Sequence, residues 1–83
     1  MKKPDEILLM KTLIEETEKC VKHQKVIPYF RGVVNRLGIN EKRAAYILYK
    51  YADKGFIDCG VSILAGWIEL DKLDELKNII EIG

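Results

Sequence analysis

The chain has 83 residues, of which 48% are hydrophobic and 33% are charged. This length has room for one small domain, and the composition excludes the disordered, collagen-like and low-complexity classes of protein. The 14 basic and 13 acidic residues leave a net charge of +1, which favours no class of partner until the positions of the charges are considered.

Side chains that could perform catalysis are few. The sequence has one histidine, His23, one serine, Ser62, and two cysteines, Cys20 and Cys59. Neither Ser62 nor His23 lies in a nucleophile motif, and no glycine-rich phosphate-binding motif occurs. The cysteines and His23 could supply three zinc ligands, but a structural zinc site needs four, and the CxxC spacing is absent. We therefore expect no enzymatic activity, no cofactor and no metal, and cysteines that act as small buried hydrophobic residues.

The hydropathy and the start of the chain predict a cytoplasmic protein without a membrane partner. No apolar run reaches the roughly 18 residues that a membrane-spanning helix needs. Asp5 and Glu6 stand where a signal peptide would begin its apolar region. In the cytoplasm Cys20 and Cys59 should stay reduced, although the sequence leaves their redox role open.

The first predicted helix covers residues 4–23. Pro4 suits the first position of a helix, and the acids Asp5 and Glu6 favour its positive end. His23 would lie near the negative end, where a cation is stabilised. An apolar stripe recurs at helical spacing along this segment. It comprises Ile7, Met10, Leu13, Ile14, Thr17, Cys20 and Val21.

Two further helices with a tight turn between them are predicted next. Residues 25–27 should be extended, because the helical conformation is disfavoured before a proline. The second helix begins at Pro28 and ends at Gly38, which can adopt the positive φ of a C-terminal cap. Asn40 is a suitable N-terminal cap for the third helix, 41–54, so the pair forms a helix-turn-helix. The inward positions are Phe30, Val33, Val34 and Leu37 on one helix and Ala44, Ile47, Leu48 and Tyr51 on the other.

The last part of the chain predicts a hairpin over residues 56–70 and a helix over residues 72–82. Two short runs rich in β-forming residues flank a loop that is bounded by Gly60 and Gly66. Asp71 can cap the final helix. The apolar stripe of that helix comprises Leu73, Leu76, Ile79 and Ile80. The predicted fold is a single α+β domain that is mostly helical.

Four segments, in their order and spacing, resemble a known superfamily. They are VVNRLGIN (33–40), the helix 41–54, KGFI (54–57) and GWIEL (66–70). Over roughly residues 5–70 the chain is similar to the winged helix-turn-helix superfamily of small bacterial and archaeal regulators. The resemblance implies a sequence-specific DNA-binding protein that regulates transcription, with a helix-turn-helix at 28–54, a wing at 56–70 and an extra C-terminal helix. The subfamily is not assigned.

The charges are distributed unevenly along the chain. Residues 24–55 hold seven basic and two acidic side chains, a net charge of +5, whereas residues 5–23 carry −2 and residues 56–83 carry −4. Binding to the phosphates of DNA needs such a basic segment. The alternative is an ordinary solvated surface, because small helices commonly expose lysine and arginine.

In the docking that the resemblance implies, the third helix enters the major groove of double-stranded DNA. Lys42, Arg43 and Tyr46 would face the base edges, with Arg43 able to contact guanine through two hydrogen bonds. Tyr49 could donate to a phosphate or pack against a partner. Contacts with phosphates are expected from Lys50, Lys54, Arg31 and Arg36.

The predicted wing carries no charge over residues 61–65, although wings that enter the minor groove commonly carry arginine or lysine. An exposed pair of Ile63 and Leu64 would suggest contact with another protein. Tyr46 and Tyr49 fit a protein interface as well as they fit DNA. An alternative function is therefore a protein-interaction module that docks through the wing and the tyrosines. The loop could equally fold back over its own core.

A homodimer is expected through the first and last helices. The apolar stripe of the last helix is large for a terminal helix, and a C2 dimer would hide it while presenting two recognition helices to two half-sites. The alternative is packing of the last helix on the first within one chain. The residues assigned to an interface with a second chain or a partner are Leu73, Leu76, Ile79, Ile80, Ile63 and Leu64.

Overall fold

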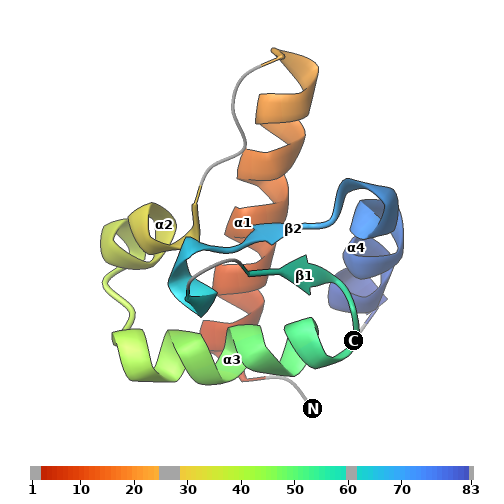
Figure 1. Ribbon diagram of the computed structural model, residues 1–83. Coiled ribbons are helices and arrows are strands. Elements are labelled where there is room, and N and C mark those ends of the chain that lie inside the picture. The colour runs from red at the N-terminus through yellow and green to blue at the C-terminus, as the bar shows by residue number, and fades with distance from the viewer. Residues whose placement is uncertain (1–2, 25–28, 60–61, 83) are drawn as a thin grey trace.

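The computed structural model describes residues 3–24, 29–59 and 62–82 (Figure 1). Its α-helices are α1 (Pro4–Lys22), α2 (Phe30–Leu37), α3 (Glu41–Asp53) and α4 (Leu73–Ile82). Its strands are β1 (Ile57–Asp58) and β2 (Trp67–Ile68), and short 3-10 helices cover Ile63–Ala65 and Leu70–Lys72. The chain is thus an α+β protein that is mostly helical. The extended piece expected at 25–27, Pro28 and Val61 lie outside the described residues.

Helix α1 is the central element of the fold. Figure 1 shows it upright, with α2 on one side, α4 on the other and α3 across its lower end. Pro4 begins the helix, and Asp5 and Glu6 fill the first turn, as expected from the positive end of a helix dipole. His23 is its C-terminal cap residue, as expected for a side chain at the negative end. Its buried face consists of Glu6, Leu9, Met10, Leu13, Ile14 and Thr17.

The turn between α2 and α3 has the geometry predicted from its residues. Gly38 adopts φ +71°, and its N–H donates to the Asn35 carbonyl, which closes the end of α2. The side-chain oxygen of Asn40 accepts hydrogen bonds from the backbone N–H groups of Lys42 at 2.9 Å and Arg43 at 3.3 Å. These bonds satisfy two of the four N–H groups that the first turn of a helix leaves without a helical partner. Both predicted caps are therefore confirmed.

The sheet is smaller than the predicted hairpin. Strands β1 and β2 pair antiparallel, with Ile57 opposite Ile68 and Asp58 opposite Trp67. A β-carbon at Gly66 would lie 2.6 Å from the Asp58 carbonyl oxygen, so only glycine permits this close approach. Each strand therefore contributes two paired residues, and the segment between the strands does not continue the hairpin.

The segment between the strands turns inward and does not form an exposed apolar tip. Ile63 and Leu64 lie in a 3-10 helix that packs against α2 and α3, and both side chains are buried. Burying two large apolar side chains stabilises a small domain more than exposing them, by about 2 kcal/mol each. The expected exposure of Ile63 and Leu64 is wrong, and the alternative, a loop folded over its own core, describes the structure.

Helix α4 packs on α1 within the same chain. Leu76 and Ile80 are buried, and Leu73 and Ile79 are partly buried against the core. The apolar stripe expected to be exposed for a second chain is thus covered by the fold itself. This correction removes the observation on which the expected dimer interface rested. The part of the chain that the structure describes contains no helix long and apolar enough to cross a membrane.

Candidate nucleic-acid interface

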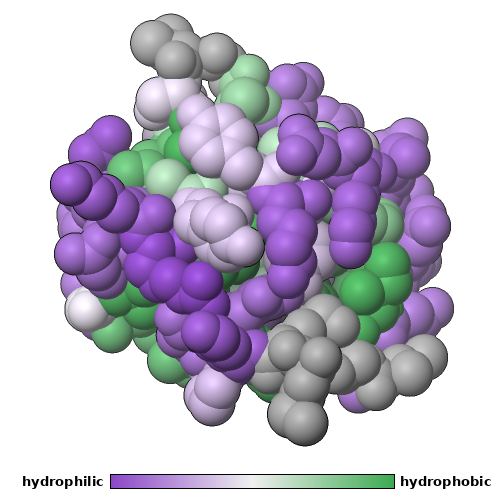
Figure 2. Space-filling view, turned by 90° about the horizontal axis from the view of Figure 1, so that it is seen from below, coloured by the Kyte–Doolittle hydropathy of each residue, from purple (hydrophilic) through white to green (hydrophobic). Residues whose placement is uncertain are grey.

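The outer face of α3 is the candidate site. The inner residues of this helix, Ala44, Ile47, Leu48 and Tyr51, are completely buried, so helical periodicity turns the intervening positions outward. Figure 2 shows this side of the molecule from below, where hydrophilic residues surround paler ones. Tyr46 is 66% exposed and Tyr49 is 52% exposed, which is unusual for large aromatic side chains. Lys42 and Lys54 are exposed, whereas Arg43 and Lys50 are partly buried.

Arg43 is held by an acid from the first turn of α1. Its Nε donates to Asp5 Oδ2 at 2.7 Å, and its Nη2 donates to Asp5 Oδ1 at 3.2 Å. This hydrogen-bonded pair lowers the pKa of the Asp5 carboxyl and raises the pKa of the Arg43 guanidinium. The guanidinium also lies 5.4 Å from the centre of the Tyr46 ring, within the range of a cation–π contact. The ion pair with Asp5 and the contact with the Tyr46 ring thus both restrain Arg43.

Lys50 takes part in a second contact between α1 and α3. Its Nζ donates to Glu6 Oε1 at 2.9 Å, while the buried Tyr51 hydroxyl donates to Glu6 Oε2 at 2.6 Å. Glu6 is only 4% exposed, and such a carboxylate needs a cation and hydrogen-bond donors to offset its lost hydration. Burial, followed by the bond to Glu6, raises the pKa of Tyr51, so its hydroxyl stays protonated and remains a donor.

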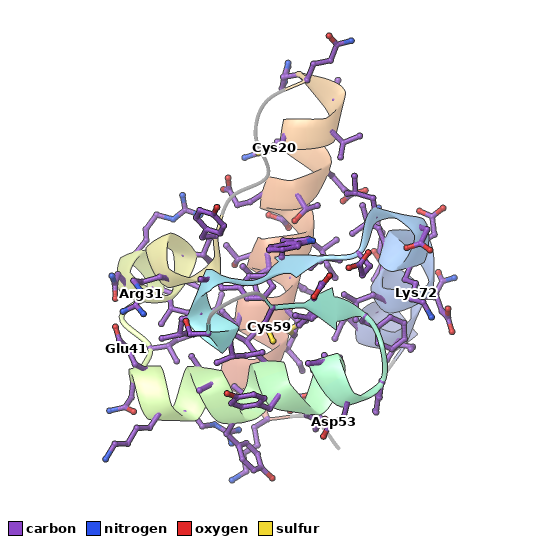
Figure 3. All side chains as sticks on the ribbon, viewed as in Figure 1. Cys20, Arg31, Glu41, Asp53, Cys59 and Lys72 are labelled. Carbon is purple, nitrogen blue, oxygen red and sulfur yellow. The ribbon has the colours of Figure 1, made fainter. Side chains whose placement is uncertain are left out.

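The two predicted phosphate contacts on α2 also have acidic partners. Arg36 Nη2 lies 2.9 Å from Glu16 Oε1 of α1, and Arg31 Nη1 lies 3.5 Å from Glu41 Oε2 at the start of α3. Figure 3 shows Arg31 and Glu41 on either side of the turn. Both arginine side chains are more than half exposed, so these pairs contribute little to stability and can exchange partners.

Among the residues that the structure describes, these pairs partly neutralise the basic segment. Four of the six predicted basic contacts, Arg31, Arg36, Arg43 and Lys50, each have a carboxylate within 3.5 Å. Lys42 has no ion pair within the described residues, and Lys54 Nζ lies over the Tyr51 ring at 5.7 Å. The local net charge is therefore lower than the sequence segment 24–55 alone indicates.

The sequence does not predict that the acids Asp5 and Glu6 pair with residues of α3. The sequence predicts Asp5 and Glu6 at the positive end of a helix dipole, a role that they also fill. Asp5 and Arg43 are 38 residues apart, and Glu6 and Tyr51 are 45 apart. The net charge of −2 over residues 5–23 was the available signal, because an acidic helix beside a basic one favours such pairs.

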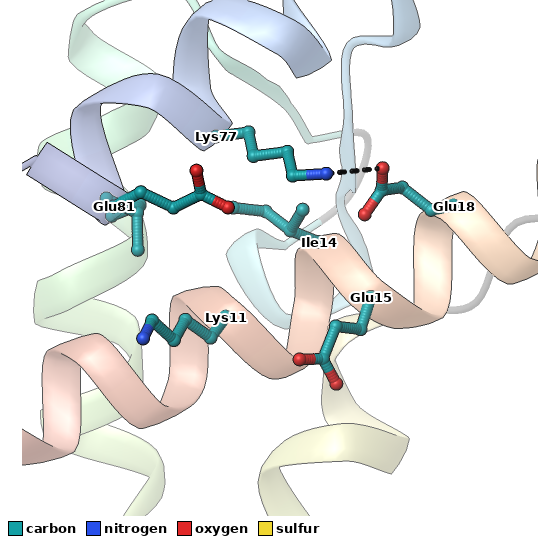
Figure 4. Close-up of a pocket in the computed structure, with 7 residues that line it drawn as sticks. Lys11, Ile14, Glu15, Glu18, Lys77 and Glu81 are labelled. Carbon is teal, nitrogen blue, oxygen red and sulfur yellow. Dashed lines mark hydrogen bonds and ion pairs between the residues drawn. The ribbon is translucent and has the colours of Figure 1, made fainter.

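Two hollows border helix α1. One is lined by Lys3, Glu6, Arg43, Tyr46 and Lys50 and has a volume of about 290 Å³. It adjoins the candidate site and combines three cations with one carboxylate. The other, about 260 Å³, lies between α1 and α4. It contains the Lys77–Glu18 ion pair at 3.2 Å, which raises the pKa of Lys77 (Figure 4).

No group of residues in the described chain suggests a metal site. The described ranges contain no cluster of three or more histidine, cysteine, aspartate or glutamate side chains that could hold an ion. Cys20 and Cys59 are free and half-buried. Figure 3 shows Cys20 toward the far end of α1 and Cys59 beside the sheet. Comparison with protein-family models, curated proteins and solved structures finds no match for this chain.

Proposed function

We propose that this protein binds double-stranded DNA through the outer face of α3 and thereby regulates transcription. The observation that carries the proposal is the exposure of Lys42, Tyr46 and Tyr49 on the helix that follows the glycine turn, and of Lys54 at the C-terminal cap of that helix. A helix in this position of a helix-turn-helix fits the major groove, and tyrosine and lysine side chains donate to phosphates and base edges. The resemblance to winged helix-turn-helix regulators supports the same docking.

The ion pairs divide the basic residues other than Arg43 into two groups. Lys42 and Lys54 are exposed cations that can contact DNA without first losing a carboxylate partner in the described chain. Arg31, Arg36 and Lys50 would each exchange a carboxylate for a phosphate, so the net gain of each contact is smaller. We therefore expect weak binding to random DNA with a moderate salt dependence, equivalent to about two to four phosphates per chain.

The test is the affinity for a labelled random duplex, measured by fluorescence anisotropy at several salt concentrations. The double variant Lys42→Ala/Lys54→Ala should reduce the salt slope by about two units. Lys19→Ala/Lys22→Ala is the matched control, because it removes the same charge from the exposed far end of α1. Equal loss in both double variants, or no binding of wild type at low salt, would refute binding through α3.

A homodimer that assembles on DNA remains part of the proposal, since two recognition helices would occupy two half-sites of an operator. Its interface must use residues other than Leu76, Ile80, Ile63 and Leu64, which are buried in the chain. Sedimentation equilibrium with and without duplex DNA measures the stoichiometry. One chain per duplex at saturation would refute the homodimer.

The exposed tyrosines support a second candidate, a protein-interaction module. Tyr46 and Tyr49 lie on a face whose neighbours Arg43 and Lys50 are already paired with acids, which suits a protein surface of mixed polarity. The wing contributes nothing to this candidate through Ile63 and Leu64 because both are buried. Full DNA affinity in Tyr46→Ala/Tyr49→Ala, despite loss of these side chains, would favour a separate role for the tyrosines.

A further inference from the structure

We propose that Asp5 is a positioning residue that orients Arg43 to contact a guanine in the major groove. This inference rests on the proposed function and adds the base that α3 would select. It assigns to the first turn of α1 a part in specificity, although this helix itself stays outside the groove.

The hydrogen bonds from Asp5 occupy one defined edge of the Arg43 guanidinium. The carboxylate accepts from Nε at 2.7 Å and from Nη2 at 3.2 Å, which is the edge nearest the side-chain stem. A guanidinium has five N–H donors in one plane, so the opposite edge keeps one N–H on Nη1 and one on Nη2. No described residue accepts a hydrogen bond from this edge. Its two parallel donors match the O6 and N7 acceptors of guanine.

Arg43 is ordered before it meets a ligand. The Tyr46 ring lies 5.4 Å from the guanidinium, and only 29% of the arginine side chain is exposed. Ordering a free arginine on binding costs rotamer entropy, and this cost is smaller when the side chain is already held. A held guanidinium also has a defined plane, which a planar base edge requires. Lys42, which is exposed and carries a point charge, provides neither property.

The pairing of Arg43 with Asp5 favours a base over a phosphate as the ligand. Phosphate oxygens could also accept from the free edge, but the Asp5 carboxylate is bonded to the same guanidinium and neutralises much of its charge. This pairing weakens the attraction of the guanidinium for an anionic phosphate, whereas hydrogen bonds to a neutral guanine lose less. Arg43 is also the third residue of α3, in the part of a recognition helix that contacts base edges.

The experiment combines selection with a modified base. Wild type and the Asp5→Asn, Asp5→Glu and Glu16→Gln variants each select binders from a random duplex library. The preferred duplex is then compared with one that carries 7-deazaguanine at the selected guanine, which lacks N7 but keeps Watson–Crick pairing. Glu16→Gln is the matched control, because it removes one negative charge from α1 and breaks the pair with Arg36 at 2.9 Å. Thermal unfolding verifies that each variant folds.

The expected result separates orientation from charge. Wild type should select guanine and lose about tenfold in affinity when N7 is removed. Glu16→Gln should select the same base and show the same loss of affinity. Asp5→Asn should bind random DNA more tightly, because an acid is lost. Its affinity for the preferred duplex should nevertheless fall by less than about threefold when 7-deazaguanine replaces the guanine. Asp5→Glu, which keeps a bidentate carboxylate, should restore most of the discrimination. Arg43→Lys should abolish it while keeping the charge.

Three results would overturn the inference. Unchanged discrimination in Asp5→Asn would mean that Asp5 only competes with DNA for Arg43. DNA binding by wild type without sensitivity to 7-deazaguanine would place Arg43 on phosphates and leave the proposed function intact. Failure of wild type to bind any duplex at low salt would overturn the inference together with the proposed function.

Discussion

Glu6 illustrates how a single residue links the core to the candidate interface. Its carboxylate is almost fully enclosed, yet it accepts hydrogen bonds from Lys50 on the rim of the site and from Tyr51 in the core. Loss of hydration makes an enclosed charge unfavourable, and each of these donors offsets part of this cost. The bond from Tyr51 should therefore matter more than an average hydrogen bond.

Replacing Tyr51 by phenylalanine tests this expectation. The variant keeps the buried ring but removes one donor from the Glu6 carboxylate, so the free energy of unfolding should fall by about 1–3 kcal/mol. Tyr49→Phe is the control, because the Tyr49 side chain is 52% exposed and the change should stay within about 0.5 kcal/mol. Urea unfolding at neutral pH measures both variants. Similar midpoints would show that the Glu6 network contributes little.

At the scale of elements, the turn between α2 and α3 is determined by local chemistry. Gly38 has φ +71° with open space around its missing side chain, so a substitution there is opposed by backbone conformation alone. Asn40 bonds to N–H groups two and three residues along the chain. Such short-range contacts follow from residue type, which is why both caps could be predicted without a structure.

Replacing Asn40 by alanine should shift the stability of the whole domain. The change removes the acceptor for the Lys42 and Arg43 N–H groups and should lower the free energy of unfolding by about 1 kcal/mol. Asn35→Ala serves as the comparison, because Asn35 is exposed within α2, where alanine is the better helix former. Chemical denaturation should thus measure a lower free energy of unfolding for Asn40→Ala, and an unchanged or slightly higher one for Asn35→Ala. The opposite order would rule out capping by Asn40.

Elements determined by distant contacts could not be predicted in the same way. Helices α1, α3 and α4 follow from apolar periodicity, and their observed ends lie close to the predicted ones. The β-rich runs gave only two paired residues each, because Gly66 brings the strands together while Ile63 and Leu64 turn into the core. The same distinction applies to the candidate site. Helical periodicity predicts that Tyr46 points outward, but the pairing of Asp5 with Arg43 depends on how α1 crosses α3 and could not be predicted.

For the whole molecule, the question is whether one chain suffices to cover its apolar surface. Chains of this size bury only about 60% of the surface that they expose when unfolded, so many gain stability by association. Here α1 is covered by α4 as well as by α2 and α3, and the 3-10 segment of Ile63 and Leu64 packs against α2 and α3. The described chain thus covers the apolar stripe of α4 by itself, while Leu8, Val21 and Leu70 stay about half exposed.

The variant Ile80→Val and a dilution series test this conclusion together. Ile80 is buried between α4 and α1, so loss of one methylene should lower the free energy of unfolding by about 0.5–1.5 kcal/mol. Folding of a single chain makes the thermal midpoint independent of protein concentration, in the variant as in wild type. If the stripe instead packed between two chains, the midpoint would rise with concentration, and Ile80→Val would increase dissociation. Calorimetry over a hundredfold range of concentration distinguishes these outcomes, because dimer stability depends on mass action and packing within one chain does not.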